Sequence, residues 1–115
     1  MHMTLESLIT ISRGEYLMIP SNRKATHPGI ILLKEFLEPM GLSQKALATH
    51  IGISVQRVNE IVRGKRGVSP DTAWLLSEAF GTSPEFWLNL QATHDLSSHR
   101  PATHIQPLTA VSTQQ

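Results

Sequence analysis

Residues 43–66, SQKALATHIGISVQRVNEIVRGKR, contain the pattern that decides the fold. Ser43 is a typical helix N-cap, and the mostly good helix formers after it predict a helix that Gly52 ends. Ser54 is a second N-cap. After it, apolar residues recur at helical spacing, namely Val55, Val58, Ile61 and Val62. The stretch therefore predicts two short helices joined by a glycine turn.

The predicted helix pair must cross at a steep angle, because apolar side chains of both helices have to converge on one small core. Those side chains are Leu47, Ile51, Ile53, Val58 and Ile61. Ala48 is small enough to permit a close approach, and Gly52 has the backbone freedom that a short turn needs. The pattern predicts a helix-turn-helix unit, in which the second helix enters the major groove of DNA while the first crosses the backbone.

The charge distribution supports a nucleic-acid partner, although the formal net charge of the whole chain is only +1. Residues 43–67 hold five basic residues and one acidic residue, a balance of +4. The remainder of the chain holds five basic and eight acidic residues, a balance of −3. A basic face on an otherwise slightly acidic protein is the electrostatic pattern expected for phosphate binding.

Side chains on the outer face of the second helix are the candidates for base contact. We expect Val55 to meet a thymine methyl, Gln56 an adenine edge, Arg57 a guanine and Glu60 a cytosine amine. Other polar residues lie at helix starts or on the following loop, and are expected to contact the DNA backbone: Ser43, Gln44, Ser54, Asn59, Arg63, Lys65 and Arg66. The alternative for any single one of them is a solvated surface residue.

Three further helices are predicted from their start signals, which gives an all-α fold of five helices. Pro28 starts a helix over 28–38, which ends at Pro39 and the glycine two residues later. Its inner side is expected to carry Ile30, Leu33, Leu37 and Met40. A serine, a proline and an acidic residue in succession start helices over 70–80 and 84–94.

The chain is predicted to form one domain with two flanks. Residues 27–96 form the helix-turn-helix domain, residues 1–26 a flexible N-terminal arm, and residues 97–115 a disordered tail rich in Ser, His, Thr, Pro and Gln. Met18 precedes a short polar run and is an alternative biological start, in which case the earlier residues are an extension.

The last predicted helix has apolar residues on more than one side, and one small core has room for only some of them. A monomeric helix-turn-helix also contacts too few base pairs to be selective. We therefore expect a homodimer, with an interface that includes Trp74, Phe80, Phe86, Trp87, Leu88 and Leu90. The alternative is a core that the C-terminal tail wraps.

The composition argues against several other classes of protein. Without cysteine there is no disulfide framework and no thiolate metal site. His94, His99 and His104 are spaced by five residues, which spreads them over different helix faces, so we expect no metal site. No nucleophile–base pattern or glycine-rich phosphate loop predicts an enzyme, and no cofactor is expected. No signal peptide or membrane span is predicted, which favours the cytoplasm.

Four runs of sequence carry a family resemblance that extends from about residue 27 to residue 96. They are HPGIIL at 27–32, LSQKALA at 42–48, RVNEIVRGKR at 57–66 and SPEFWLNLQ at 83–91. The chain resembles the lambda-repressor-like (XRE/Cro-CI) helix-turn-helix proteins of the phage-repressor type, and within them the HigA-type antitoxins of bacterial toxin–antitoxin pairs. Together the four runs are far more specific than a lone helix-turn-helix pattern.

The resemblance implies a homodimeric repressor that binds an inverted repeat of double-stranded DNA at a promoter. It also implies that the protein neutralises a HigB/RelE-like ribonuclease toxin while repressing the operon that encodes both proteins. Two alternatives stay open, a stand-alone phage-type regulator without a toxin and a protein-interaction module that has lost DNA binding. A neighbouring gene for a small basic ribonuclease would favour the antitoxin, and the cations of residues 57–66 argue against the interaction module.

Overall fold

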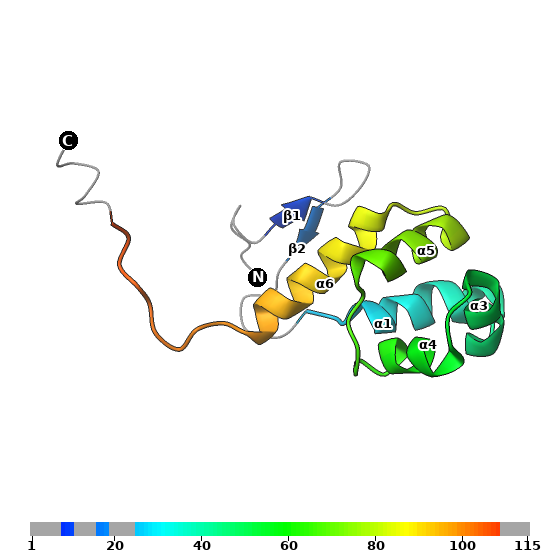
Figure 1. The fold of residues 1–115 in the computed structure, drawn as a ribbon. Coiled ribbons are helices and arrows are strands. Elements are labelled where there is room, and N and C mark those ends of the chain that lie inside the picture. Colours follow the sequence, from blue (N-terminus) through cyan, green and yellow to red (C-terminus); the bar gives the residue numbers. More distant parts are fainter. Residues whose placement is uncertain (1–7, 11–15, 19–24, 109–115) are drawn as a thin grey trace.

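The computed structural model describes residues 8–10, 16–18 and 25–108, and within them it holds a bundle of helices (Figure 1). The elements in chain order are β1 (Leu8–Thr10), β2 (Tyr16–Met18), α1 (Pro28–Ile31), η3 (Leu32–Leu37), α2 (Glu38–Met40), α3 (Gln44–Ile51), α4 (Val55–Val62), α5 (Pro70–Phe80) and α6 (Pro84–Ser98). Because α1, η3 and α2 follow one another without a break, they form one helix, here called the first helix. The predicted five-helix all-α domain is confirmed.

The first helix runs past Pro39 because its middle segment, η3, is a π-helix. The N–H of Glu38 donates to the carbonyl of Leu33, five residues back instead of four. Proline normally breaks a helix because it lacks an N–H and crowds the carbonyl four residues earlier. In the π-helical segment before Pro39, N–H groups bond carbonyls five residues back, so the α-helical bonding to the carbonyl four residues earlier is already absent there. The helix therefore continues through Pro39 to Met40, two residues past the expected end at residue 38, and the expected stop at Gly41 is confirmed. Just after it, the Leu42 N–H donates to the Leu37 carbonyl.

The same wider turn changes which face of the first helix is buried. Leu32 and Leu37, five residues apart, are both buried, whereas Ile30 and Met40 are exposed and Leu33 is half-buried. The assignment of Ile30 and Met40 to the buried side of the first helix is therefore wrong, because it assumed a uniform α-helical period. Only Leu37 of the expected set is fully in the core.

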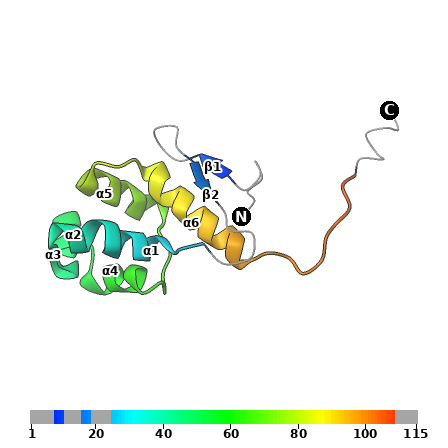
Figure 2. The same ribbon diagram turned by 180° about the vertical axis from the view of Figure 1, so that it is seen from behind.

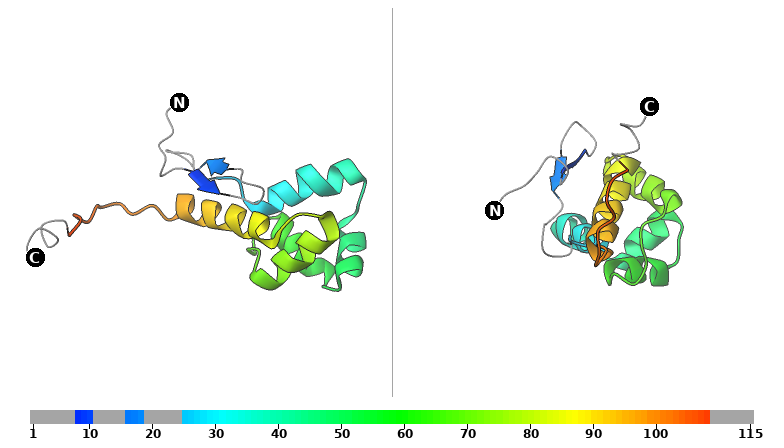
Figure 3. Two further views of the ribbon diagram at one scale, coloured as in Figure 1. Left: turned by 90° about the horizontal axis from the view of Figure 1, so that it is seen from above. Right: turned by 90° about the vertical axis from the view of Figure 1, so that its left-hand side faces the viewer.

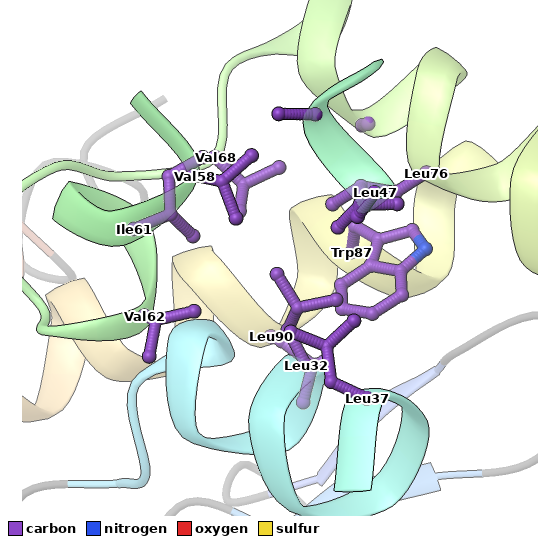
Figure 4. Packing of buried hydrophobic residues seen from close by; sticks show 12 residues of the cluster. Leu32, Leu37, Leu47, Val58, Ile61, Val62, Val68, Leu76, Trp87 and Leu90 are labelled. Atoms are coloured by element: carbon purple, nitrogen blue, oxygen red, sulfur yellow. The ribbon is translucent and has the colours of Figure 1, made fainter. Parts of the chain in front are cut away.

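Trp87 on α6 is the largest fully buried side chain of the core, at 0% exposure. Side chains of the first helix, α3, α4, α5 and α6 converge around it (Figure 4). The buried hydrophobic cluster consists of Leu32, Leu37, Leu47, Ala48, Val58, Ile61, Val62, Val68, Ala73, Leu76, Trp87 and Leu90. Predicted core residues Leu47, Val58 and Ile61 are buried, and Ile51 and Ile53 pack half-buried against the cluster. The apolar residues that the sequence predicted to converge between the two helices therefore lie in the core or against it.

Gly29, near the start of α1, lies directly against the end of α4. A Cβ atom built on Gly29 would lie 1.8 Å from the carbonyl oxygen of Ile61. The atom it would strike belongs to the backbone, so no side-chain rotation relieves the clash. Glycine is required here because the two helices approach too closely for any side chain.

We expect Gly29→Ala to lower the free energy of unfolding by about 1–3 kcal/mol or more, because the extra methyl forces α1 away from α4. For a domain of this size, each kcal/mol lowers the melting temperature by about 4–8 °C. Gly41→Asn is the matched control, since a Cβ at Gly41 meets nothing within 4 Å and asparagine tolerates its left-handed backbone. A Gly29→Ala melt as high as that of the control would contradict the close approach.

Two short strands, which the sequence did not predict, pair in the N-terminal segment. β1 and β2 are antiparallel, with Leu8 opposite Met18, Ile9 opposite Leu17 and Thr10 opposite Tyr16. Both strands lie near α6 (Figure 3). Three-residue strands are too short to show an alternating pattern, so only the tertiary structure reveals the pairing. The other residues of the predicted flexible arm, apart from Ala25 and Thr26, lie outside the described residues.

The C-terminal helix extends further than the sequence predicted. α6 continues to Ser98, where an end near residue 94 was expected, and the buried Ser97 hydroxyl accepts a hydrogen bond from Ala25 N–H at 2.7 Å. This contact explains the extra turn, because it ties the end of α6 to the segment before α1. Residues 101–108 are exposed and lead away from the bundle (Figure 2).

His27 caps the first helix and contacts α6 at the same time. Its Nδ1 accepts a hydrogen bond from Gly29 N–H at 2.9 Å, and its ring meets the His94 ring edge-on, with centroids 4.8 Å apart. His94 Nδ1–H donates to the Ala25 carbonyl at 2.9 Å. Burial lowers the pKa of His27 below its ordinary 6.5, His94 lowers it further, and Asp95 partly opposes the shift. His27 is therefore the N-cap of the first helix.

We predict that acid weakens the fold through His27. Its depressed pKa means that the folded protein binds this proton less readily than the unfolded chain, so the stabilisation is complete above about pH 6.5 and is lost as the pH falls below it. His27→Asn keeps a capping side chain without the titration, so its melting temperature should fall less between pH 7.5 and pH 5.5. His104→Asn, in the exposed tail, is the control. An identical pH profile for wild type and His27→Asn would exclude this role.

Candidate nucleic-acid interface

The α3–α4 pair has the caps and the turn that its sequence predicted. Ser43 Oγ accepts a hydrogen bond from Ala46 N–H at 3.0 Å, and Ser54 Oγ accepts one from Arg57 N–H at 3.1 Å. Gly52 ends α3 with a left-handed backbone, φ 79°, that a non-glycine residue adopts at a cost. Both serine caps are confirmed, and they fix the N-termini of α3 and α4.

A hydrogen bond between side chains sets the position of α3 on α4. Asn59 Nδ2 donates to Gln44 Oε1 at 3.1 Å, and both side chains are partly buried. The sequence predicted each of them as a contact to the DNA backbone, and the structure brings them together. Whether either also binds a phosphate stays a prediction.

The outward face of α4 carries three of the four predicted base-contacting residues. Val55 is 48% exposed, Gln56 is exposed and Glu60 is half-exposed. Gln56 Nε2 donates to Glu60 Oε2 at 3.4 Å, and Arg66 Nε donates to Glu60 Oε1 at 2.8 Å. The hydrogen bond from Arg66 is the main cause that lowers the pKa of Glu60. The face therefore presents an apolar group, an amide and an ionised carboxylate.

Arg57, the fourth predicted base-contacting residue, is turned away from this face. Its Nη2 donates to Thr72 Oγ1 on α5 at 2.9 Å, and Thr72 is only 1% exposed. Ser69, the N-cap of α5, also donates to Thr72 Oγ1, at 3.2 Å. In the free chain the guanidinium therefore joins α4 to α5, and the guanine contact expected for Arg57 would require it to leave Thr72.

The loop after α4 presents the expected exposed cations beside the outward face of α4, here called the recognition face, which carries Val55, Gln56 and Glu60. Arg63 follows the last turn of α4, and Lys65 and Arg66 lie in the loop, all three exposed. The backbone N–H groups of Lys65 and Arg66 donate to the Glu60 carbonyl, at 2.8 and 3.2 Å. This turn keeps the cations beside α4 instead of letting the loop extend away.

The predicted dimer residues fall into two groups. Trp74 is 58% exposed, and Phe80, Phe86 and Leu88 are half-buried, so these four present surface. Trp87 and Leu90 are core residues, which corrects their assignment to an interface. From the sequence, α6 was expected to have more apolar side chains than one core can bury. In the structure, Phe86 and Trp87 of α6 join Phe36 and Phe80 in a cluster of aromatic rings.

Phe36 and Leu96 are two relevant residues that sequence reasoning missed. Phe36 packs on Phe80 with ring centroids 4.9 Å apart, and its place in the π-helix hid it from an α-helical pattern. Leu96 is 59% exposed on α6 and is a further candidate for an interface between subunits. The available signal was an apolar residue at position 96, two residues beyond the expected end of the helix at residue 94.

Within the described part of the chain, the histidines do not form a metal site. No group of three or more His, Asp or Glu residues is placed to hold an ion there. His94 bonds the Ala25 carbonyl and His99 bonds the Asp95 carbonyl at 2.8 Å. None of the helices over residues 28–98 has the length and apolar character needed to cross a membrane.

The helix-turn-helix family profile matches residues 33–87, which include α3, α4 and α5. The virulence-associated protein I of Dichelobacter nodosus is 51% identical over 72 residues, which cover 63% of this chain and 67% of the relative. The antitoxin HigA of Pseudomonas aeruginosa, solved with the higBA promoter, is 44% identical with a TM-score of 0.64, and the match covers 65% of this chain and 82% of that chain. The chain belongs to the HigA-type helix-turn-helix family.

A second solved structure is similar to a larger part of the chain. It is a Pseudomonas aeruginosa protein in complex with its operator DNA of 18 base pairs, 40% identical with a TM-score of 0.70. The match covers 74% of this chain and 98% of that chain. Members of this HigA-type family are DNA-binding regulators, which agrees with the exposed face of α4.

For Arg57 we now expect a structural effect in place of an effect on base preference. Arg57→Ala removes a hydrogen bond from a charged donor to buried Thr72, a loss of about 1.5–3 kcal/mol. The melting temperature should fall by several degrees, while the order of preferred DNA sequences stays unchanged. Arg63→Ala, exposed at the end of α4, is the control for loss of a cation. An unchanged melt with relaxed preference at one base would restore the guanine contact.

Proposed function

We propose that this HigA-type regulator is a sequence-specific transcriptional repressor that acts as a homodimer on an inverted-repeat operator. The observation that carries the proposal is the exposed face of α4, with Val55, Gln56 and Glu60 on the helix and a loop of cations beside it. Such a face has the side chains for base contact and the charges for phosphate contact on one side of one element. Relatives solved with a promoter or an operator support the same role.

We propose further that the chain is the antitoxin of a toxin–antitoxin pair and neutralises a RelE-like ribonuclease toxin. The support is the similarity to antitoxin HigA, which extends over 65% of this chain. We assign no residue to toxin binding. As a regulator of its own operon, the protein would act in the cytoplasm without catalysing a reaction.

For the homodimer, the proposed interface lies on the exposed parts of α5 and α6. Trp74, Phe80, Phe86 and Leu88 remain from the sequence prediction, and Leu96 joins them. A large aromatic residue that is more than half exposed is typical of the centre of a protein interface. Two-fold symmetry would place two α4 helices in successive major grooves.

The functional proposal predicts selective binding to DNA from the region upstream of the gene. In a gel-shift titration at fixed salt, the wild-type protein should bind that fragment at least about 10³-fold more tightly than random DNA of equal length. Arg63→Ala should weaken both and reduce the salt slope by about 1.8, because the dimer loses one phosphate contact in each subunit. Equal affinity for upstream and random DNA would contradict a sequence-specific repressor.

The homodimer proposal predicts a dimer by light scattering at tens of micromolar protein. The half-site centres of its operator should lie about 10 base pairs, or a multiple, apart. Leu96→Lys places a charge on the proposed interface and should shift the protein toward monomer, whereas Lys34→Ala, exposed on the first helix, should not. A wild-type monomer that binds a single half-site with full affinity would exclude this interface.

A further inference from the structure

Glu60 lies at the centre of three joined side chains on the recognition face. Arg66 Nε donates to its Oε1 at 2.8 Å, and Gln56 Nε2 donates to its Oε2 at 3.4 Å. Each carboxylate oxygen therefore has one N–H donor and keeps a further lone pair free. The carboxylate is oriented by its neighbours and still able to accept a hydrogen bond from outside.

The backbone brings Arg66 to this position. The loop after α4 folds back so that the N–H groups of Lys65 and Arg66 both donate to the Glu60 carbonyl. The Arg66 side chain then returns over α4 to Glu60, whereas no hydrogen bond or ion pair among the described residues joins the Lys65 ammonium to that carboxylate. Two adjacent cations on one loop thus have different surroundings.

A carboxylate on a face that meets DNA needs a specific reason, because phosphate groups repel it. Arg66 offsets this repulsion by neutralising the charge of Glu60, and it also keeps the pKa of Glu60 low, so that the group only accepts hydrogen bonds. In the major groove, guanine presents acceptors and thymine presents an acceptor and a methyl group. Adenine presents its amine next to the acceptor N7, and N7 repels the second carboxylate oxygen. Cytosine presents an amine alone, and it fits an oriented carboxylate best.

We infer that Arg66 is a positioning residue that orients Glu60 to select a cytosine in each half-site, in place of the phosphate contact that the sequence predicted for Arg66. The inference rests on the proposed DNA-binding function. The competing explanation is a surface ion pair that only ties the loop to α4. Exposed ion pairs contribute little to stability, so a melting experiment does not separate the two explanations, whereas base preference does.

The first experiment needs no DNA. The carboxyl carbon of Glu60 is followed by NMR through an acid titration in wild type, Arg66→Ala and Lys65→Ala. Arg66→Ala should raise the pKa of Glu60 clearly, and Lys65→Ala should change it less, because Lys65 acts only through its charge. Equal pKa values in wild type and Arg66→Ala would overturn the positioning role.

The second experiment measures base preference. The wild-type protein selects its preferred sequence from a randomised double-stranded library, and affinities are then measured for every single-base change at one salt concentration. Arg66→Ala should reduce the discrimination for cytosine at one position of the half-site by about fivefold or more, the lower bound for a good base contact. Preferences at all other positions should remain unchanged.

Two matched variants make the result specific. Glu60→Gln should change the preferred base at that same position from cytosine to adenine, because glutamine pairs with the adenine edge. Lys65→Ala should weaken all sequences by one common factor. If Arg66→Ala behaved like Lys65→Ala, Arg66 would be a phosphate contact and the inference would be overturned. If the wild type selected no sequence, the proposed function would fail together with the cytosine assignment, while the titration would still report the Arg66–Glu60 contact.

Discussion

The close approach of α1 to α4 is the constraint on which the rest of the structure depends. A Cβ atom on Gly29 would lie 1.8 Å from the Ile61 carbonyl oxygen, so only glycine lets the two backbones meet there. Ile61 and Val62, at the end of α4, are buried as a result, and the opposite side of α4 is left exposed. His27, which caps the same end of α1, ties this junction to α6 through His94. The orientation of the recognition face is therefore set from behind, by packing.

Two arginines of this region have roles that their position in the sequence conceals. Arg57 follows Ser54 at the start of α4 and bonds buried Thr72 on α5. Arg66 follows the end of α4 and bonds Glu60. Both contacts join other elements to the recognition face, so each of these guanidinium groups already has a partner within the free chain. Arg63 and Lys65 remain as exposed cations without such a contact among the described residues.

The aromatic cluster gives a second example of packing that changes an assignment. Phe36, Phe80, Phe86 and Trp87 form edge-on and tilted ring contacts, and Trp87 Nε1 donates to Thr82 Oγ1 at 2.8 Å. An indole whose N–H is satisfied inside the protein has no need of a partner surface. Most of the large apolar side chains of α6 are therefore packed within one subunit. Trp74 and Leu96 are the large apolar residues of α5 and α6 that remain more than half exposed.

The amino-acid sequence by itself determined the helices, their caps and the family. Ser43, Ser54, Ser69 and Ser83 cap the helices that they were predicted to cap, because capping depends on a side chain and the backbone N–H three residues later. The four characteristic runs predicted the HigA-type family, which the comparisons confirm. Helical spacing also identified Leu47, Val58 and Ile61 as core residues.

Only the tertiary structure decided which side of the first helix is buried, where Arg57 and Arg66 point, and which apolar residues of α6 are exposed. The π-helical turn shifts the buried face from Ile30 to Leu32, a change of register that no α-helical period reveals. The partners of Arg57 and Glu60 lie 15 and 6 residues away and are chosen by how the helices and the loop pack. Local structure depends on neighbours in the chain and can be predicted from them, whereas the direction of a long charged side chain depends on contacts that exist only after the helices have packed.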